Sequence, residues 1–314
     1  MTSNEFVHHF VTAHLHVKAG KPRPQQPPDF EIIENRWLAL HGLGKLETFR
    51  YLYSECCSVD DFHQWLRDTR GADTVAEAGQ LFDGVVTEET ESASAPVLNA
   101  EQWQHWQEQG YLKIGGLVPF DYCERVKQFI CAYQGIDLHD TATWYPQHTD
   151  WHGLMVQVYQ QPDMEAIRRQ PAVKQLFAEL YQTRQIAANT DKVSYNPPET
   201  EHWQFRHHHL HWDIDHSRPP EYYIQGLIYL DDTPEDRGPL RLIPGFHHRY
   251  QAYQQQFNDP VAAQQAITSE PGAIPVPGRQ GDIVVWLQTL PHAASINRSD
   301  RPRFVQYLSF TRLD

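Results

Sequence analysis

The chain has 314 residues, of which 40% are hydrophobic, and a formal net charge of −14 at pH 7. This length suits one large domain with an extension, or two modest domains. An acidic chain repels phosphate groups, and no apolar run is long enough to span a bilayer, so we expect neither a nucleic-acid nor a membrane partner.

The N-terminus and the cysteines predict a cytoplasmic location. The first residues, MTSNEFVHHF, have neither the basic region nor the apolar stretch of a secretory signal. The four cysteines include no CxxC pair, which predicts neither a disulfide framework nor a thiolate zinc site. They are Cys56, Cys57, Cys123 and Cys131.

Residues 1–97 are expected to form a mostly helical extension. Residues 18–30 are rich in proline and predict an irregular or extended segment. A helix follows from Ser58, which can cap it with Asp61 three residues later, to Gly71. Residues 87–97 are polar and acidic, which is typical of a linker or an exposed loop. We therefore place a domain boundary there and expect a second domain over residues 98–314.

The second domain begins with helical patterns. Asn99 is a candidate N-cap with Gln102 at the capping-box position, and Gly110 can end that helix. Residues 120–135 predict an amphipathic helix, and residues 171–182 predict another. We expect the apolar face of the first of these to contain Tyr122, Val126, Phe129 and Tyr133.

From about residue 190 the pattern changes to short strands. Runs rich in Val, Ile, Tyr and Phe are separated by turn sequences such as IPGF and VPGRQGD. Closely spaced short strands without long helices between them favour an antiparallel sandwich or barrel. The fold class expected for the whole chain is mainly β with flanking helices.

Residues 207–216, HHHLHWDIDH, are the first candidate for a metal site. If this stretch is a strand, alternate residues project to one side. On one side would then lie His207, His209, His211, Asp213 and Asp215. An H-x-D tripeptide such as His211–Asp213 supplies an imidazole and a carboxylate to one metal ion. The tripeptide from His148 to Asp150 also fits but has no clear strand pattern, so we prefer the first.

Residues 281–303, GDIVVWLQTLPHAASINRSDRPR, are the second part of the candidate site. A glycine turn leads into a strand and then to His292. Arg303 follows eleven residues later at the start of another strand. A planar guanidinium matches a carboxylate through two parallel hydrogen bonds, so a dicarboxylate could chelate the metal at one end and bind Arg303 at the other. Taken alone, His292 also fits a core histidine and Arg303 a surface residue.

Together, these motifs and the stretch LNAEQWQHWQEQGYLKIGGLVP resemble the phytanoyl-CoA dioxygenase family of iron(II)- and 2-oxoglutarate-dependent oxygenases. The resemblance covers residues 98–312. It implies a double-stranded β-helix, that is, a jelly-roll or cupin-like core. It also implies iron bound by His211, Asp213 and His292, with Arg303 holding the distal carboxylate of 2-oxoglutarate.

The resemblance suggests further site residues. Ser194 and Asn196 lie where such enzymes often place additional co-substrate contacts. The family often has a hydroxyl residue where this chain has Ala294, with Ser295 next to it. A role in lining the substrate pocket is open for three residues that fit core packing equally well. They are Trp212, Gln225 and Trp286.

The expected activity is hydroxylation of an unactivated C–H bond in a small-molecule metabolite, with O2 consumed and succinate and CO2 released. Desaturation, cyclisation and epimerisation use the same kind of centre and stay open. Two alternatives are a non-catalytic cupin-like module that binds metal and a protein hydroxylase of the JmjC type. For residues 1–97, a lid, a homodimer surface and a docking element for a carrier protein all stay open.

Overall fold

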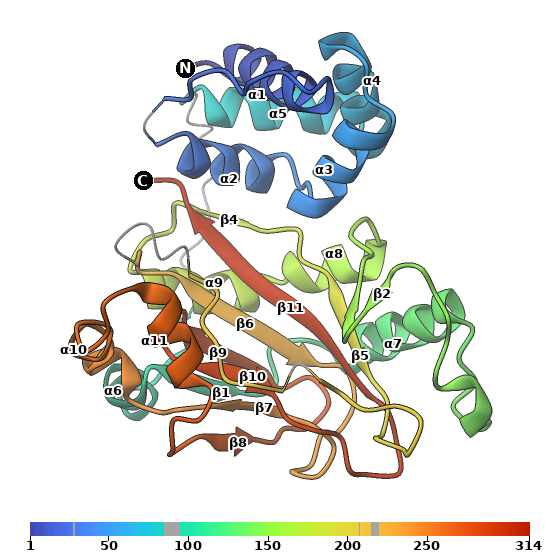
Figure 1. Cartoon of the computed structure of the whole chain (residues 1–314), viewed down its shortest axis with the longest axis vertical. Helices are drawn as coiled ribbons and strands as arrows, with labels where there is room; N and C mark the ends of the chain where they lie inside the picture. Colours follow the sequence, from blue (N-terminus) through green and yellow to red (C-terminus); the bar gives the residue numbers. More distant parts are fainter. Residues whose placement is uncertain (28, 85–94, 207, 215–219) are drawn as a thin grey trace. The chain divides into compact units, whose positions relative to one another are not determined.

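The structure is a computed structural model that describes residues 1–27, 29–84, 95–206, 208–214 and 220–314. The chain divides into two compact units. The first contains Met1–Ala95, Tyr181–Asp191 and Phe310–Asp314, and the second contains Pro96–Leu180 and Lys192–Ser309. Figure 1 labels the helices and strands of both.

The first unit is mostly helical. Ser58 caps α4 by accepting a hydrogen bond from the backbone of Asp61, and the helix ends before Gly71, as predicted. The proline-rich stretch, in its described residues, is irregular between the first two helices, also as predicted. A short strand, β4 (Ile186–Ala188), pairs with residues 310–312. The helices are α1 (Ser3–Lys18), α2 (Phe30–Leu40), α3 (Lys45–Ser54), α4 (Val59–Arg70) and α5 (Ala72–Phe82).

Aromatic side chains fill the core of this helical unit. Phe6, Phe10 and Trp37 are fully buried. His41 stacks on Trp37 with ring centroids 3.8 Å apart, and its Nδ1 faces the Trp37 carbonyl at 2.8 Å. Burial lowers the pKa of His41 to about 4, because a charged imidazole is disfavoured there.

Helices also flank the strands of the second unit. Asn99 and Gln102 form the predicted capping box of α6, and Gly110 ends that helix in the left-handed conformation. The helices are α6 (Ala100–Gln109), α7 (Phe120–Gln134), α8 (Pro162–Arg168), α9 (Pro171–Tyr181), α10 (Tyr250–Gln254) and α11 (Pro260–Ile267), with 3-10 turns η1 (Thr141–Thr143) and η2 (Phe246–His248).

The predicted apolar face of α7 is wrong in part. Val126 is buried as expected, but Phe129 and Tyr133 are only partly buried. These two rings stack on each other along the flank of the helix, and the Tyr133 hydroxyl donates to Asp150. Smaller side chains occupy the closely packed side instead. The buried residues are Cys123, Val126, Ile130 and Gln134.

The core of the second unit is an antiparallel arrangement of a large and a small sheet, as the strand-rich sequence predicts. The large sheet has the order β1-β9-β6-β11-β5-β3-β2, with β4 also paired to β11. Its strands are β1 (Tyr111–Ile114), β2 (Trp151–His152), β3 (Met155–Val156), β5 (Val193–Asn196), β6 (Ile224–Tyr229), β9 (Ile283–Leu287) and β11 (Arg303–Arg312). The small sheet has the order β10-β7-β8, with β7 (Leu240–Leu242), β8 (Ile274–Val276) and β10 (His292–Ala294).

The two faces of the large sheet have different partners. On one face, Gln306 donates to the carbonyl of Met164 in α8, and Gly226 leaves room for Phe177 of α9. On the other face, the Tyr229 hydroxyl donates to Val276 of the small sheet at 2.7 Å. Since alternate residues of a strand point to opposite faces, the strand register assigns a further set of residues to the face turned toward the small sheet. They are Arg303, Ser194, Asn196, Gln225 and Trp286.

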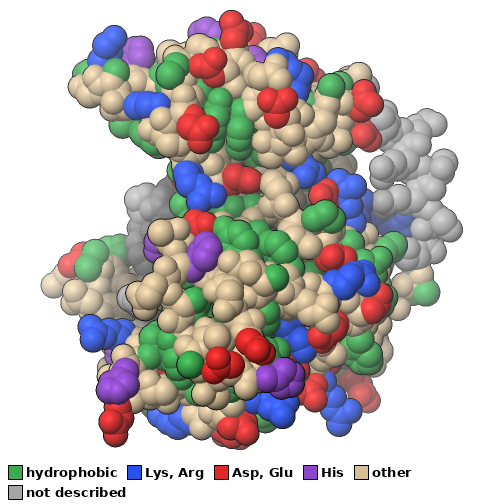
Figure 2. All heavy atoms as spheres, turned by 90° about the vertical axis from the view of Figure 1, so that its right-hand side faces the viewer, with side chains coloured by type: hydrophobic (Ala, Val, Ile, Leu, Met, Phe, Trp, Pro, Cys, Tyr) green, Lys and Arg blue, Asp and Glu red, His purple; other side chains and the backbone are tan. Residues whose placement is uncertain are grey.

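The distribution of charged side chains on the described surface can be compared with the net negative charge of the sequence. On the face drawn in Figure 2, acidic and basic side chains are interspersed, and the described basic residues form no continuous patch there. None of the helices in the described ranges is both long enough and apolar enough to cross a bilayer. The four cysteines are free thiols.

Candidate metal centre

Two distant histidines are brought together by backbone pairing. His211 and His292 form an isolated antiparallel bridge in which each backbone N–H donates to the other carbonyl at 3.0 Å. Residues opposite each other in such a bridge project to the same side, and the two rings lie with centroids 4.7 Å apart. Asp213 completes the group. One nitrogen or oxygen atom of each of the three side chains lies within 4.8 Å of the others.

The backbone fixes which ring nitrogen of each histidine is free. The Nδ1 of His211 faces the carbonyl of His209 at 3.0 Å, and that of His292 faces the carbonyl of Leu290 at 3.1 Å. A carbonyl oxygen only accepts hydrogen bonds, so Nδ1 must carry the proton in both rings. In the neutral histidines the Nε2 atoms, which face Asp213, are therefore unprotonated and could bind a metal ion.

Asp213 is oriented by a chain of two hydrogen bonds. Its Oδ2 atom accepts from Gln225 Nε2 at 2.8 Å, and Gln225 Oε1 accepts from Trp286 Nε1 at 3.0 Å. Its carboxylate oxygens lie 3.8 Å and 3.4 Å from the Nε2 atoms of His211 and His292. Gln225 and Trp286 therefore orient the carboxylate of Asp213. A role for them in lining a substrate pocket stays a prediction.

The electrostatics of the group favour a charged carboxylate beside a neutral imidazole. Desolvation acts to raise the pKa of Asp213, but the neighbouring His292 and His211 and the hydrogen bond from Gln225 outweigh it and hold this pKa well below its ordinary value. Solvent still reaches Asp213, whose side chain is 58% exposed. Burial, followed by the nearby His292, lowers the pKa of His211. Both groups are then in the form that binds a cation.

The described residues of 207–216 do not form the strand that the alternating pattern would require. Its one ladder contact is the bridge at His211, and the residues on either side are irregular. The backbone carbonyl of His208 accepts from Arg241, and the carbonyl of His209 accepts from His211. These loop contacts replace a regular ladder. His207 and Asp215 lie outside the described residues.

Trp212 points away from the two residues that flank it. It is buried among Phe246, Tyr250 and Tyr253, and its indole N–H donates to the carbonyl of Thr289 at 3.0 Å. This packing anchors the H-x-D tripeptide. A pocket-lining role for Trp212 stays a prediction. The other H-x-D tripeptide, His148–Asp150, is not part of the group, since its aspartate accepts from the Tyr133 hydroxyl.

Arg303 is a buried cation, only 1% exposed, at the start of β11. It donates to the carbonyl of Gly238 at 2.6 Å and to the hydroxyl of Ser194 at 3.1 Å, while its Nε has no partner. Among the described residues, no carboxylate pairs with it. Burial lowers the pKa of Arg303, because the charge is desolvated. A buried guanidinium without a counter-ion is a site for an anion.

The backbone comes very close to this arginine at Gly238, which has φ +67°. A Cβ there would lie 2.7 Å from the Asn196 amide nitrogen and 2.8 Å from the Ser295 carbonyl. Glycine therefore allows the carbonyl of residue 238 to reach Arg303. Asn196 faces Arg303 across the β5–β11 pair, and its buried Oδ1 has no partner. Ala294 lies in β10 opposite Leu240.

Two residues next to Arg303 were not predicted from the sequence. Tyr307 lies on the same face of β11 as Arg303 and forms a hydrogen bond with its guanidinium. Counting alternate residues from Arg303 would have found it. Gly238 could not have been found in that way, because its neighbours Asn196 and Ser295 are distant in sequence.

Comparison with known proteins agrees with this geometry. The family model described as Phytanoyl-CoA dioxygenase (PhyH) matches residues 106–305. A Dictyostelium discoideum protein named "Putative phytanoyl-CoA dioxygenase" is 21% identical over 257 residues, which are 66% of this chain and 73% of that protein.

Two solved structures are similar in fold. One is the non-heme alpha ketoglutarate dependent carbocyclase SnoK from nogalamycin biosynthesis, with a TM-score of 0.52 at 19% identity, covering 70% of this chain and 88% of that one. The other is EctD from S. alaskensis with 2-oxoglutarate and 5-hydroxyectoine, with a TM-score of 0.50 at 15% identity, covering 71% and 78%. At these identities the similarity concerns the fold.

Proposed function

We propose a reaction for this chain, which belongs to the phytanoyl-CoA dioxygenase (PhyH) family and is an iron(II)- and 2-oxoglutarate-dependent dioxygenase. The proposed reaction is the hydroxylation of an unactivated C–H bond in a small-molecule metabolite. The observation that carries this proposal is the convergence of His211, Asp213 and His292 on the face of the large sheet that also carries Arg303, a buried arginine that pairs with no carboxylate among the described residues. The reaction would consume O2 and 2-oxoglutarate and release succinate and CO2.

The donor set fits iron(II). Two imidazole nitrogens and one carboxylate oxygen are the ligands of non-haem iron oxygenases, and they leave coordination positions open. His211 and His292 would each supply Nε2, and Asp213 would supply a carboxylate oxygen. The bound metal would supply the activation of O2. The protein fixes the tautomer and orientation of both imidazoles through Nδ1 and holds the carboxylate through Gln225.

Arg303 would bind the distal carboxylate of 2-oxoglutarate. Its Nε is free, and the Ser194 hydroxyl lies 3.1 Å from one of its terminal nitrogens. The Tyr307 hydroxyl also contacts the guanidinium. We assign Ser194 and Tyr307 to the same carboxylate site and Asn196 to its rim. With Ala294 where the family often has a hydroxyl residue, the hydroxyl of Ser194 or Tyr307 can provide the second contact.

We also propose that the two sheets form a double-stranded β-helix carried by residues 98–314, with residues 1–97 as an N-terminal extension whose compact unit also includes residues 181–191 and 310–314. The bridge between His211 and His292 extends the small sheet by one position, and side chains of the large sheet contact it. The family match begins at residue 106, which supports the boundary. A small-molecule substrate is supported by EctD, whose structure contains 5-hydroxyectoine.

The experiment that tests this function measures succinate formed from 2-oxoglutarate with iron(II) and a panel of small metabolites. The parent protein should bind iron(II) and 2-oxoglutarate and form succinate, while an Arg303→Met variant should keep the metal and lose 2-oxoglutarate. A metal-binding protein that ignores millimolar 2-oxoglutarate would instead be a non-catalytic module. A protein that hydroxylates only peptides would be a hydroxylase of the JmjC type.

A further inference from the structure

At the start of its strand, the backbone of Arg303 pairs with only one of the two neighbouring strands. The β11–β5 pair includes Arg303, which lies opposite Asn196. The β11–β6 pair begins two residues later, at Val305 opposite Tyr229. The residue before Arg303 is Pro302, which has no backbone N–H to donate. The position of the Arg303 guanidinium therefore depends on what holds the chain just before the strand.

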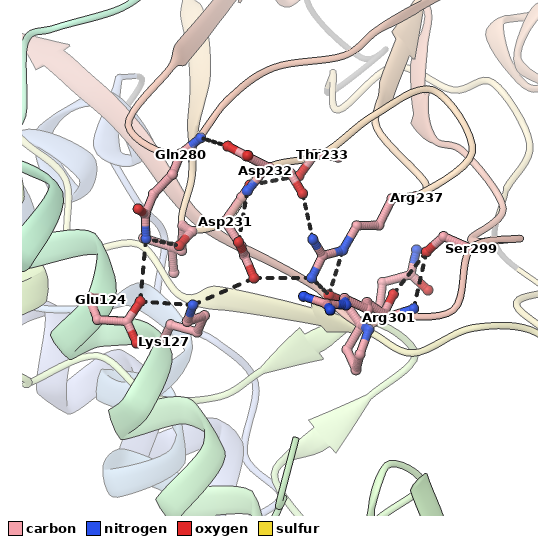
Figure 3. Close-up of polar contacts among 12 residues, drawn as sticks. Glu124, Lys127, Asp231, Asp232, Thr233, Arg237, Gln280, Ser299 and Arg301 are labelled. Carbon is pink, nitrogen blue, oxygen red and sulfur yellow. Dashed lines mark hydrogen bonds and ion pairs between the residues drawn. The ribbon is translucent and has the colours of Figure 1, made fainter. Parts of the chain in front are cut away.

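The side chain of Arg237 holds that point. It donates to the Pro302 carbonyl from Nε at 2.9 Å and from a terminal nitrogen at 2.6 Å. The same guanidinium donates to the carbonyl of Asp232 at 2.6 Å and to the carboxylate of Asp231 at 3.0 Å. Arg237 is only 7% exposed. Figure 3 shows its guanidinium with its contacts to Asp231 and Asp232. A planar fork of donors suits this arrangement, and a single ammonium does not.

The contacts of Arg237 continue to helix α7. Asp231 also faces Lys127 of that helix at 3.5 Å, and Lys127 pairs with Glu124 at 2.8 Å (Figure 3). Gln280 donates to Glu124 and to the carbonyl of Leu230. Carboxylates and backbone carbonyls thus fix Arg237 from several sides. Its charge is compensated by Asp231, in contrast to that of Arg303.

Residues 237 and 238 therefore hold Arg303 at two points. The side chain of Arg237 fixes the carbonyl of Pro302, and the carbonyl of the next residue, Gly238, accepts from the Arg303 guanidinium at 2.6 Å. Moving residues 237–238 would displace both the base and the tip of the Arg303 side chain. Charged binding groups lose their advantage when they are displaced by about 1 Å.

We propose that Arg237 is a positioning residue that sets Arg303 for the distal carboxylate of 2-oxoglutarate. This inference rests on the proposed function of the site. Arg237 itself is paired with Asp231 and backbone carbonyls and acts through Arg303. The loss of Arg237 should weaken recognition of the second carboxylate and leave the metal centre unchanged.

The test compares two 2-oxo acids on protein loaded with manganese(II), by calorimetric titration without O2. 2-Oxoglutarate has the distal carboxylate, and 2-oxopentanoate has the same chain length without it. The variants are Arg237→Gln, Arg237→Lys and Asp231→Asn. The control is Arg125→Gln, which removes an arginine paired with Asp121 and Asp163 on the surface.

We expect Arg237→Gln to weaken 2-oxoglutarate binding on the order of tenfold, as is common for residues that orient a binding group. Binding of 2-oxopentanoate and of manganese(II) should not change. Arg237→Lys should fall between the parent and the glutamine variant, and Arg125→Gln should match the parent. If the glutamine variant does not fold, Arg237→Lys and Asp231→Asn must show the same selective loss.

Two results would contradict different claims. If the parent prefers 2-oxoglutarate and the Arg237 variants weaken both acids equally, or neither, then Arg237 does not position Arg303. If the parent binds both acids equally or binds none, the proposed function itself fails, whatever the variants do.

Discussion

Gln225 connects the acidic ligand to the large sheet, so replacing it tests how the metal centre is held. In Gln225→Met the side chain keeps its length but loses two hydrogen bonds. Asp213 loses a donor at 2.8 Å, and the indole N–H of Trp286 loses its acceptor at 3.0 Å. The first loss acts on metal binding, and the second acts on stability.

The structure sets the size of both effects. A hydrogen bond to a charged group contributes about 1.5–3 kcal/mol when it is buried. Because Asp213 is 58% exposed, water replaces part of this bond, and we take about 1 kcal/mol. The dissociation constant for the metal should then rise about fivefold. Trp286 is only 2% exposed, so its unpaired N–H should lower the free energy of unfolding by about 1–3 kcal/mol.

The assay is a titration with manganese(II) or iron(II) without O2, combined with denaturant unfolding of the same protein. Gln288→Met is the matched control, because Gln288 is a buried glutamine that donates to a backbone carbonyl, that of Glu221, without contacting His211, Asp213 or His292. The control should lose stability but keep its metal affinity. If Gln225→Met binds the metal as tightly as Gln288→Met does, Gln225 does not orient Asp213 and the reasoning is wrong.

Three more predictions concern other parts of the chain. Gly238→Ala places a Cβ 2.7 Å from Asn196 at φ +67°, so denaturant unfolding should show a loss of about 1–3 kcal/mol, and calorimetry should show weaker 2-oxoglutarate binding. As the pH falls from about 6.5 to 4, His41 becomes protonated in the unfolded chain but stays neutral in the folded protein. The free energy of unfolding should therefore drop by at most about 1.4 kcal/mol per pH unit. Thermal unfolding of His41→Gln should show a smaller slope, and an equal slope would exclude this role. Asn99→Ala removes a helix cap and should cost about 1 kcal/mol in the same assay, with no effect on metal binding.

Local chemistry made several elements predictable. Ser58 and Asn99 cap their helices as their spacing indicates, because a cap depends on residues three positions apart. The strands with runs of β-branched and aromatic residues also lie where the pattern places them. The apolar face of α7 was less predictable. There the neighbouring elements, and not the pattern alone, decide that Ile130 is buried while Phe129 lies on the flank.

The pairing that builds the metal centre was not visible as a strand pattern. The alternating pattern of 207–216 is compatible with an extended run, but the described residues of this stretch form a single bridge, between His211 and His292. Loop contacts such as Arg241 to the carbonyl of His208 hold the segment instead. These contacts join residues far apart in sequence, so the hydrophobic and polar pattern along the chain does not reveal them.

The sequence by itself determined the chemical types of the site: an H-x-D tripeptide, a distal histidine and an arginine eleven residues after it. Their order and spacing were enough for these residues to be named, because ligand chemistry depends on residue type. Only the tertiary structure decided which atoms are free to bind. It places the proton of both histidines on Nδ1, gives Asp213 a donor from Gln225 and buries Arg303 with no carboxylate partner among the described residues. These are properties of distances and burial, which arise only when distant strands pair.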